Sequence, residues 1–221
     1  MKIVAISDIH GRIERLAVAE RDIAEADLVL LTGDITNFGR EEEANRMLEP
    51  IRQRNDNILA VTGNCDYPEV ESLLTDLNIN LHASARNPNG VSVIGLGGSL
   101  PGPASTPNEY SEGQLESFLD QASSQLDPDL PLVLNSHQPP ANTIADRLPD
   151  GSHVGSTAVR RFIEDNQPLV CFTGHIHEGV GVDEIGATKV VNPGPLHTGR
   201  YGFADIRDGH LETVEIRGSG D

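Results

Sequence analysis

The chain of 221 residues has no tryptophan, only two cysteines and no long apolar run, and each scarcity excludes a class of protein. Cys65 and Cys171 lie in separate strand-like segments without paired spacing, so we expect no disulfide framework. No run of about 18 apolar residues occurs, and the short strand after Met1 and Lys2 does not fit a signal peptide. We therefore expect a soluble, cytoplasmic protein with a single domain over residues 1–221.

Basic residues are also scarce. Lys2 and Lys189 are the only lysines, and 34 acidic residues against 16 lysines and arginines give a formal net charge of −18 at pH 7. Because binding a phosphate backbone requires neutralisation by Lys or Arg, this charge excludes long nucleic acid and anionic membranes as partners. An acidic, lysine-poor composition is typical of proteins from a salt-rich cytoplasm, where screening weakens the repulsion between carboxylates. We interpret the protein as halophilic, and an acidic mesophilic protein is the alternative.

Potential metal ligands recur at the ends of apolar runs. Each of five runs stops at one or two small residues and is followed by such a side chain: Ile3–Ser7 by Asp8 and His10, Leu28–Gly33 by Asp34, Ile58–Gly63 by Asn64, Leu132–Ser136 by His137, and Leu169–Gly174 by His175 and His177. Runs of this length, separated by segments with helical spacing, predict the buried strands of an α/β fold. Since α/β sheets hold their sites outside the carboxyl ends of the strands, these side chains are expected to meet in one pocket.

The ligand types favour a pair of divalent metals. Carboxylate and amide oxygens with imidazole nitrogens suit first-row divalent ions, and seven ligands are too many for one ion. Two metals that share a bridging carboxylate fit the count. In isolation Asn64 also fits a turn amide and His137 a strand-end histidine bonded to the backbone. The spacing of Asp8 and His10 at the end of a strand places both ligands on the same side, because side chains alternate with a period of two.

The remaining pattern predicts helices and a strand-rich tail. Helices are expected over residues 12–25, 41–54, 67–77, 111–125 and 156–165, and further strands over 91–96, 189–191, 201–206 and 210–216. Ser111 with Gln114 forms a capping box, and Asp208-Gly209 is a hairpin turn signal.

With these residues assembled, the chain resembles the calcineurin-like metallophosphoesterase superfamily, and especially its small prokaryotic and archaeal phosphodiesterase-type members. The resemblance rests on Asp8-Ile9-His10, Gly33-Asp34, Gly63-Asn64-Cys65-Asp66, His137, Gly174-His175-Ile176-His177 and Asn192-Pro193-Gly194, and so covers nearly the whole chain. It implies an α/β fold in which two sheets flanked by helices form a four-layer α/β/β/α sandwich. It also implies a first metal held by Asp8, His10, Asp34 and His177, and a second held by Asp34, Asn64, His137 and His175.

The resemblance implies a phosphoesterase that hydrolyses a small phosphodiester by attack of a metal-bridging hydroxide, without a covalent intermediate. Manganese is the first choice for both metals, with iron, zinc, nickel and magnesium as alternatives. A phosphomonoesterase is one alternative function. A non-catalytic, metal-binding interaction scaffold is another, although the ligand set of such scaffolds tends to be eroded and all seven positions are intact here.

Position 65 departs from the family. Members commonly have a histidine there that donates a proton to the leaving oxygen or contacts phosphate, whereas this chain has Cys65. A thiol between two cations and a phosphate is expected to shift toward thiolate and to be a poor acid. His153 and His197 are the candidate substitute donors, and Arg200 is a candidate phosphate clamp.

Asp66 is expected to orient a metal ligand by a hydrogen bond, and a carboxylate at a helix start is the alternative. The predicted catalytic residues are therefore Asn64, Cys65, Asp66 and His137, and the predicted substrate-binding residues are His153, His197 and Arg200.

Overall fold

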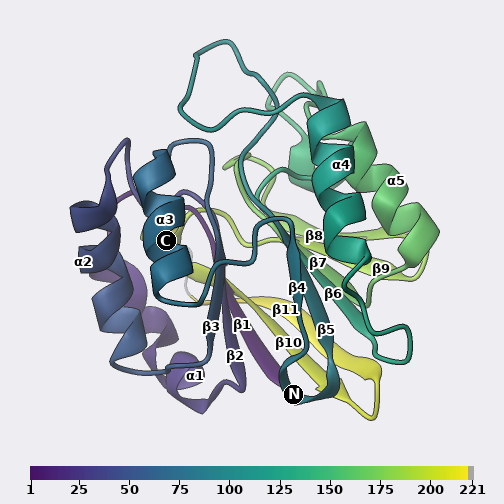
Figure 1. The fold of residues 1–221 in the computed structure, drawn as a ribbon, viewed down its shortest axis with the longest axis horizontal. Coiled ribbons are helices and arrows are strands. Elements are labelled where there is room, and N and C mark those ends of the chain that lie inside the picture. Colours follow the sequence, from purple (N-terminus) through teal and green to yellow (C-terminus); the bar gives the residue numbers. More distant parts are fainter. Residues whose placement is uncertain (219–221) are drawn as a thin grey trace.

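The computed structural model describes residues 1–218 and has two β-sheets that pack face to face, with helices on both outer faces (Figure 1). This arrangement confirms the predicted four-layer α/β/β/α sandwich. The helices and strands are β1 Lys2–Ile6, α1 Glu20–Glu25, β2 Leu28–Thr32, α2 Glu41–Arg52, β3 Ile58–Val61, α3 Pro68–Asp76, β4 Ser84–Arg86, β5 Ser92–Leu96, α4 Glu112–Ser123, β6 Leu132–Ser136, α5 Thr157–Asn166, β7 Val170–Thr173, β8 Gly181–Ile185, β9 Thr188–Asn192, β10 Arg200–Arg207 and β11 His210–Gly218.

The first sheet has the strand order β11-β10-β1-β2-β3. Strands β1, β2 and β3 run parallel to one another, whereas β10 pairs antiparallel with both of its neighbours, β1 and β11. All five residues of β2 are buried because the sheet is covered on both faces. Val29 and Leu31 pack with the helix-side core, whereas Leu28 and Leu30 pack between the sheets. Burial on both faces explains why this strand is a continuous apolar run rather than an alternating one.

The second sheet has the order β4-β5-β6-β7-β9-β8, with parallel β5, β6, β7 and β9 and antiparallel edge strands β4 and β8. Helices α4 and α5 cover its outer face through Leu115, Leu119, Val159 and Ile163. The inter-sheet core includes Phe172 of β7. The carboxyl ends of the parallel strands of both sheets lie at the same end of the molecule, and the connecting loops gather there (Figure 1).

Several local predictions hold and some do not. The Ser111 and Gln114 capping box and the hairpin turn between β10 and β11 are confirmed, and both cysteines are free and buried. The predicted helix 12–25 is wrong in its first half, where Glu14–Ala19 is a 3₁₀ segment that precedes α1. Its buried residues Leu16 and Ala19 are three apart, which fits the 3₁₀ repeat, and neither segment has a side-chain cap.

The edge strands β4 and β8 were not predicted from the sequence. In β8 exposed and partly exposed residues alternate and two of them, Asp183 and Glu184, are acidic, so the strand lacks an apolar run. No helix within residues 1–218 is long and apolar enough to cross a membrane.

Candidate metal centre

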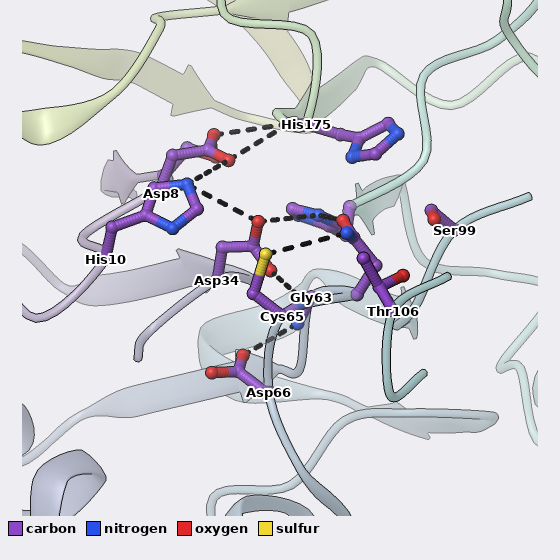
Figure 2. A network of polar contacts seen from close by, with 12 residues as sticks. Asp8, His10, Asp34, Gly63, Cys65, Asp66, Ser99, Thr106 and His175 are labelled. Atoms are coloured by element: carbon purple, nitrogen blue, oxygen red, sulfur yellow. Dashed lines mark hydrogen bonds and ion pairs between the residues drawn. The ribbon is translucent and has the colours of Figure 1, made fainter. Parts of the chain in front are cut away.

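The seven predicted ligands come together at the carboxyl ends of strands from both sheets. Ligand atoms that lie within 4.8 Å of one another form three groups, and two of these consist of predicted ligands only: the first contains Asp8, His10 and His177, and the second contains Asp34, His137 and His175. Asn64 adjoins the second group, since its Oδ1 lies 3.0 Å from Nε2 of His137. Figure 2 shows Asp8, His10 and Asp34 with their polar atoms turned toward one another.

The first group has three ligand atoms that converge. Nε2 of His10 lies 3.1 Å from Nε2 of His177, and Oδ1 of Asp8 lies 3.7 Å and 3.3 Å from these two nitrogens. Two imidazole nitrogens and a carboxylate oxygen that face one another are a suitable set for a divalent cation.

Asp34 lies between the two groups. Its Oδ2 is 3.5 Å from Nε2 of His10 and 3.6 Å from Nε2 of His137, while its Oδ1 accepts a hydrogen bond of 2.8 Å from the backbone N–H of Cys65. One oxygen of this carboxylate therefore faces a ligand of each group, and the other is held by the backbone.

The tautomer of His137 is fixed by its surroundings. Nδ1 lies 2.8 Å from the carbonyl oxygen of Thr32, to which it donates its proton. In a neutral imidazole of this tautomer Nε2 carries no proton, and it points toward Asp34 and Asn64, as a metal ligand requires.

Glycines precede three of the ligands because another ligand packs against them. A Cβ on Gly174 would lie 2.5 Å from Oδ2 of Asp8, one on Gly33 2.3 Å from Nδ1 of His137, and one on Gly63 2.1 Å from Oδ1 of Asp34. Each of these three strands is thus followed by a glycine that leaves space for a ligand from another strand, which belongs to the same sheet for Gly63 and to the other sheet for Gly33 and Gly174. This contact is the physical reason for the recurrence in the sequence.

Four of the ligands adopt left-handed backbone conformations, with φ of 53° at Asp8, 48° at His10, 48° at Asp34 and 67° at His175. Such strain in residues other than glycine concentrates at functional sites. β1 ends at Ile6, so the alternation argument for Asp8 and His10 is wrong. These two side chains meet because the turn after the strand bends, and not because they share a strand face.

Burial and neighbouring charges set the protonation of the cluster. Burial lowers the pKa of His10 to about 4 and that of His175 to about 3, so both imidazoles are neutral at pH 7, the form that binds metals. Burial, with the charges of Asp8 and Asp66, raises the pKa of Asp34. Burial alone would raise the pKa of Asp8 as well, but the hydrogen bond with His177 holds it below its usual range.

Asp66 contacts backbone groups and the hydroxyl of Thr36, and not a ligand side chain. It accepts hydrogen bonds from the N–H groups of Gly63, Ile35 and Thr36 at 2.8, 3.1 and 2.8 Å (Figure 2 shows the Gly63 contact). These bonds join the loops that carry Asp34 and Asn64. The side chain does not cap α3, whose N-cap residue has no side-chain cap.

Cys65 lies inside the cluster, where its Sγ forms a further group with His10 and Asp34. Burial and the charge of Asp34 raise the pKa of the Cys65 thiol. In the protein alone, the thiol form is therefore favoured over the thiolate.

The three predicted substrate-binding residues lie in different places. Burial, followed by the charges of Arg12 and His177, lowers the pKa of His197, so its ring lies within electrostatic reach of the first group. His153 is on the loop after β6, and its Nδ1 lies 2.7 Å from Oδ1 of Asp146. Arg200 begins β10, at the end of the first sheet where β1 leads into Asp8.

A cavity of about 370 Å³ adjoins the second group, and Asn64 and His175 are among its lining residues. One wall is formed by residues of the segment 99–109, which follows β5, and a second wall by Leu148, Val154 and Ile176. The sequence pattern predicts neither a helix nor a strand for the first wall. No signal in the sequence places the second wall beside it, because the two are brought together by the pairing of β5 with β6 and β6 with β7.

Known proteins resemble this chain in sequence and in fold. The family model for calcineurin-like phosphoesterases matches residues 1–179. An uncharacterized protein of Methanocaldococcus jannaschii is 38% identical over 201 residues, which are 88% of each chain. Among solved structures, TT1561 of Thermus thermophilus has a TM-score of 0.77 at 21% identity over 98% of each chain. A dimetal phosphatase from Danio rerio has a TM-score of 0.64 at 14% identity over 99% of this chain and 96% of its own.

Proposed function

Because this chain belongs to the calcineurin-like phosphoesterase family, we propose that it is a dinuclear metal-dependent phosphoric ester hydrolase that acts on a small phosphodiester. The observation that carries the proposal is the position of Asp34. Its Oδ2 lies 3.5 Å from a ligand nitrogen of the first group and 3.6 Å from one of the second, as a carboxylate shared by two cations requires.

The donor set fits two cations in the predicted grouping. The first would be held by Asp8, His10, Asp34 and His177, and the second by Asp34, Asn64, His137 and His175. Bound there, the cations supply Lewis acidity toward the phosphoryl oxygens and activate water at neutral pH. Manganese fits a mixture of carboxylate, amide and imidazole donors, and iron, zinc, nickel and magnesium are the alternatives.

The chain's own residues contribute charge, orientation and rigidity. Asp8 and Asp34 supply negative charge, while the Thr32 carbonyl holds His137 in the ligand tautomer. Asp66 ties the loops after β2 and β3, and so fixes Asp34 against Asn64. Such preorganisation lowers the cost of holding the reacting groups in place.

Two features favour a diester over a monoester. The cavity beside Asn64 and His175 gives room for a second ester group. Cys65 stands where the family commonly has an imidazole, so a charged imidazole is absent from the place where it would balance a monoester dianion. A phosphomonoesterase remains the alternative, and an interaction scaffold is disfavoured because the whole ligand set is intact and converges.

The test uses two substrates with the same leaving group. Protein stripped with a chelator and reloaded with Mn²⁺ should hydrolyse bis(p-nitrophenyl) phosphate faster than p-nitrophenyl phosphate, and the stripped protein should hydrolyse neither. Faster turnover of the monoester would establish the alternative. No metal-dependent hydrolysis of either ester would reject the enzyme assignment.

The acidic composition supports a cytoplasm of high salt as the working environment. The formal net charge of −18 implies self-repulsion that salt screens. The melting temperature should therefore rise as potassium chloride is increased from about 0.1 M to about 3 M, concentrations that span the screening range. A flat response would favour the acidic mesophilic alternative.

A further inference from the structure

The walls of the cavity beside the second ligand group are largely apolar. Its apolar lining includes Leu100, Pro101, Pro103, Leu148, Val154 and Ile176. Figure 1 shows the loop between β5 and α4, which carries one wall, extending beyond the ends of the strands. An apolar recess that opens on two polar ligands is typical of a site that binds a substrate through a polar anchor and an apolar body.

The charges of the residues that line the cavity disfavour an anionic group inside it. Among the described residues that line it there is no lysine or arginine, and Glu109 is an acid. Glu109 accepts hydrogen bonds of 2.8 and 2.7 Å from the backbone N–H and the hydroxyl of Thr106, and these bonds lower its pKa. A carboxylate or second phosphate in the recess would therefore face a negative charge without a basic partner.

The recess is preformed by hydrogen bonds between its walls. Buried Gln138 accepts a hydrogen bond of 2.9 Å from the N–H of Leu100 and donates one of 3.2 Å to the carbonyl of Val154. Asn108 ties the loop to the metal centre, since its amide donates to the carbonyl of Gly63 at 3.1 Å. The two walls are thus held at a fixed separation and at a fixed place relative to Asn64.

We infer that this cavity binds an uncharged, apolar ester group of the substrate, of the aryl or branched-alkyl class, while the phosphate lies at the metal centre. The inference rests on the proposed function and specifies its substrate. An apolar cavity of about 150 Å³ is enough to bind benzene. The present cavity, at about 370 Å³, has room for a substituted ring. A further phosphate group in the recess is disfavoured, because Glu109 is the charged residue of its described lining.

Three p-nitrophenyl diesters with a common leaving group test this assignment. With the Mn²⁺-loaded protein, kcat/KM for phenyl p-nitrophenyl phosphate should exceed that for methyl p-nitrophenyl phosphate by about tenfold or more, the range for a filled apolar pocket. The 4-carboxyphenyl ester is similar in shape to the phenyl ester but adds a negative charge. Its kcat/KM should therefore be no higher than that of the methyl ester. Equal kcat/KM for all three, or a carboxyphenyl ester as good as the phenyl ester, would overturn the inference.

Binding without turnover separates the inference from the proposed function. Diphenyl phosphate should bind the Mn²⁺-loaded protein at least about tenfold more tightly than dimethyl phosphate in titration calorimetry. Tighter binding of diphenyl phosphate without hydrolysis of any diester would reject the enzyme assignment but support the apolar cavity as a binding site. Hydrolysis with equal binding of the two diesters would retain the enzyme and reject the cavity.

Two valines provide a matched pair of variants. Val154 lines the cavity and is 38% exposed, whereas Val182 lies on β8 outside it and is 39% exposed. Val154→Asp should lower the phenyl to methyl ratio of kcat/KM by about tenfold, since it adds a charge to the recess. Val182→Asp should leave that ratio unchanged, and melting curves of both variants check the fold. An unchanged ratio in Val154→Asp would remove the cavity from substrate binding.

Discussion

The two sheets contribute different chemistry to the candidate metal centre. The oxygen ligands come only from the loops of the first sheet, which provides Asp8, His10, Asp34 and Asn64, whereas the second sheet provides the imidazoles of His137, His175 and His177. The first and second ligand groups nevertheless each draw on both sheets, whereas the group that includes Cys65 comes from the first sheet alone. Neither sheet alone therefore holds a complete set, and a cation bound in either group would link the two sheets across their interface.

The interface core provides the most direct way to break this arrangement. Phe172 of β7 is fully buried, and a Cβ on Gly202 of β10 would lie only 2.9 Å from its ring. Phe172→Ala should lower the free energy of unfolding by about 3–5 kcal/mol, the usual cost of such a cavity, and should weaken metal binding with it. Urea unfolding and metal titration measure the two effects.

Phe38 provides the control, because it is the same residue type with 51% of its surface exposed. Phe38→Ala should change stability by no more than about 0.5 kcal/mol, as surface substitutions usually do. An equal loss of unfolding free energy in the two variants would show that the inter-sheet packing of Phe172 does not stabilise the protein more than an exposed phenylalanine does.

The bridging position of Asp34 is the next point to break. Asp34→Asn keeps the size of the side chain but removes the charge that both groups share. Activity should fall by more than about 100-fold, since even hydrogen-bond partners of metal ligands are worth about 10- to 100-fold. Elemental analysis should find fewer than two metals per chain. Glu42→Gln, an exposed change on α2, should alter neither quantity.

Two metals and normal turnover in Asp34→Asn would contradict the dinuclear assignment. Loss of activity with both metals retained would instead show that the charge of Asp34 acts on the reaction and not on metal affinity.

The ligand positions could be predicted from the sequence because their constraints are local. β2 is buried on both faces and so must be apolar, and Gly33 must be small because His137 packs against it. The apolar strand, the glycine and the metal ligand therefore follow one another in the sequence. The same reasoning could not place Asp8 and His10 correctly, since the enrichment of Asp and His in left-handed turns is too weak to predict such a turn against the strand pattern.

The assignment of strands to sheets could not be predicted from local pattern. β1 pairs with β10, and the partners Ile3 and Ala204 are separated by almost the whole chain. The two-sheet architecture came from the family resemblance for this reason. The cavity walls were missed for the same reason, because Leu100 and Val154, which are far apart in the sequence, are joined through hydrogen bonds to Gln138.

Metal removal tests whether cations hold the sheets together. A ligand that binds only the folded state stabilises it by about 2.7 kcal/mol at 100 times its Kd. Mn²⁺ at that level should raise the free energy of unfolding of chelator-stripped protein by about this amount, and by much less in Asp34→Asn. Calcium at equal concentration, which prefers sites made only of oxygen ligands, controls for screening of the acidic surface. Equal stabilisation by both metals would point to screening alone.

Cys65 provides the finest test, because Cys65→His would place a second imidazole on the first sheet. Its backbone N–H holds Asp34 at 2.8 Å and does not depend on the side chain, so the substitution preserves that contact. A well-placed general acid contributes about 10²- to 10⁴-fold, and an imidazole not selected for the position should give less. We expect turnover of alkyl diesters to rise by about tenfold relative to nitrophenyl diesters, whose leaving groups depart without a proton. Cys65→Ser tests whether the sulfur is itself a metal ligand. If it is, this variant should bind less metal, since a hydroxyl is a weaker ligand for these metals. If both variants keep the metal content and the ratio of rates of the unchanged protein, Cys65 only fills space, and the proton donor must be sought at His153 or His197.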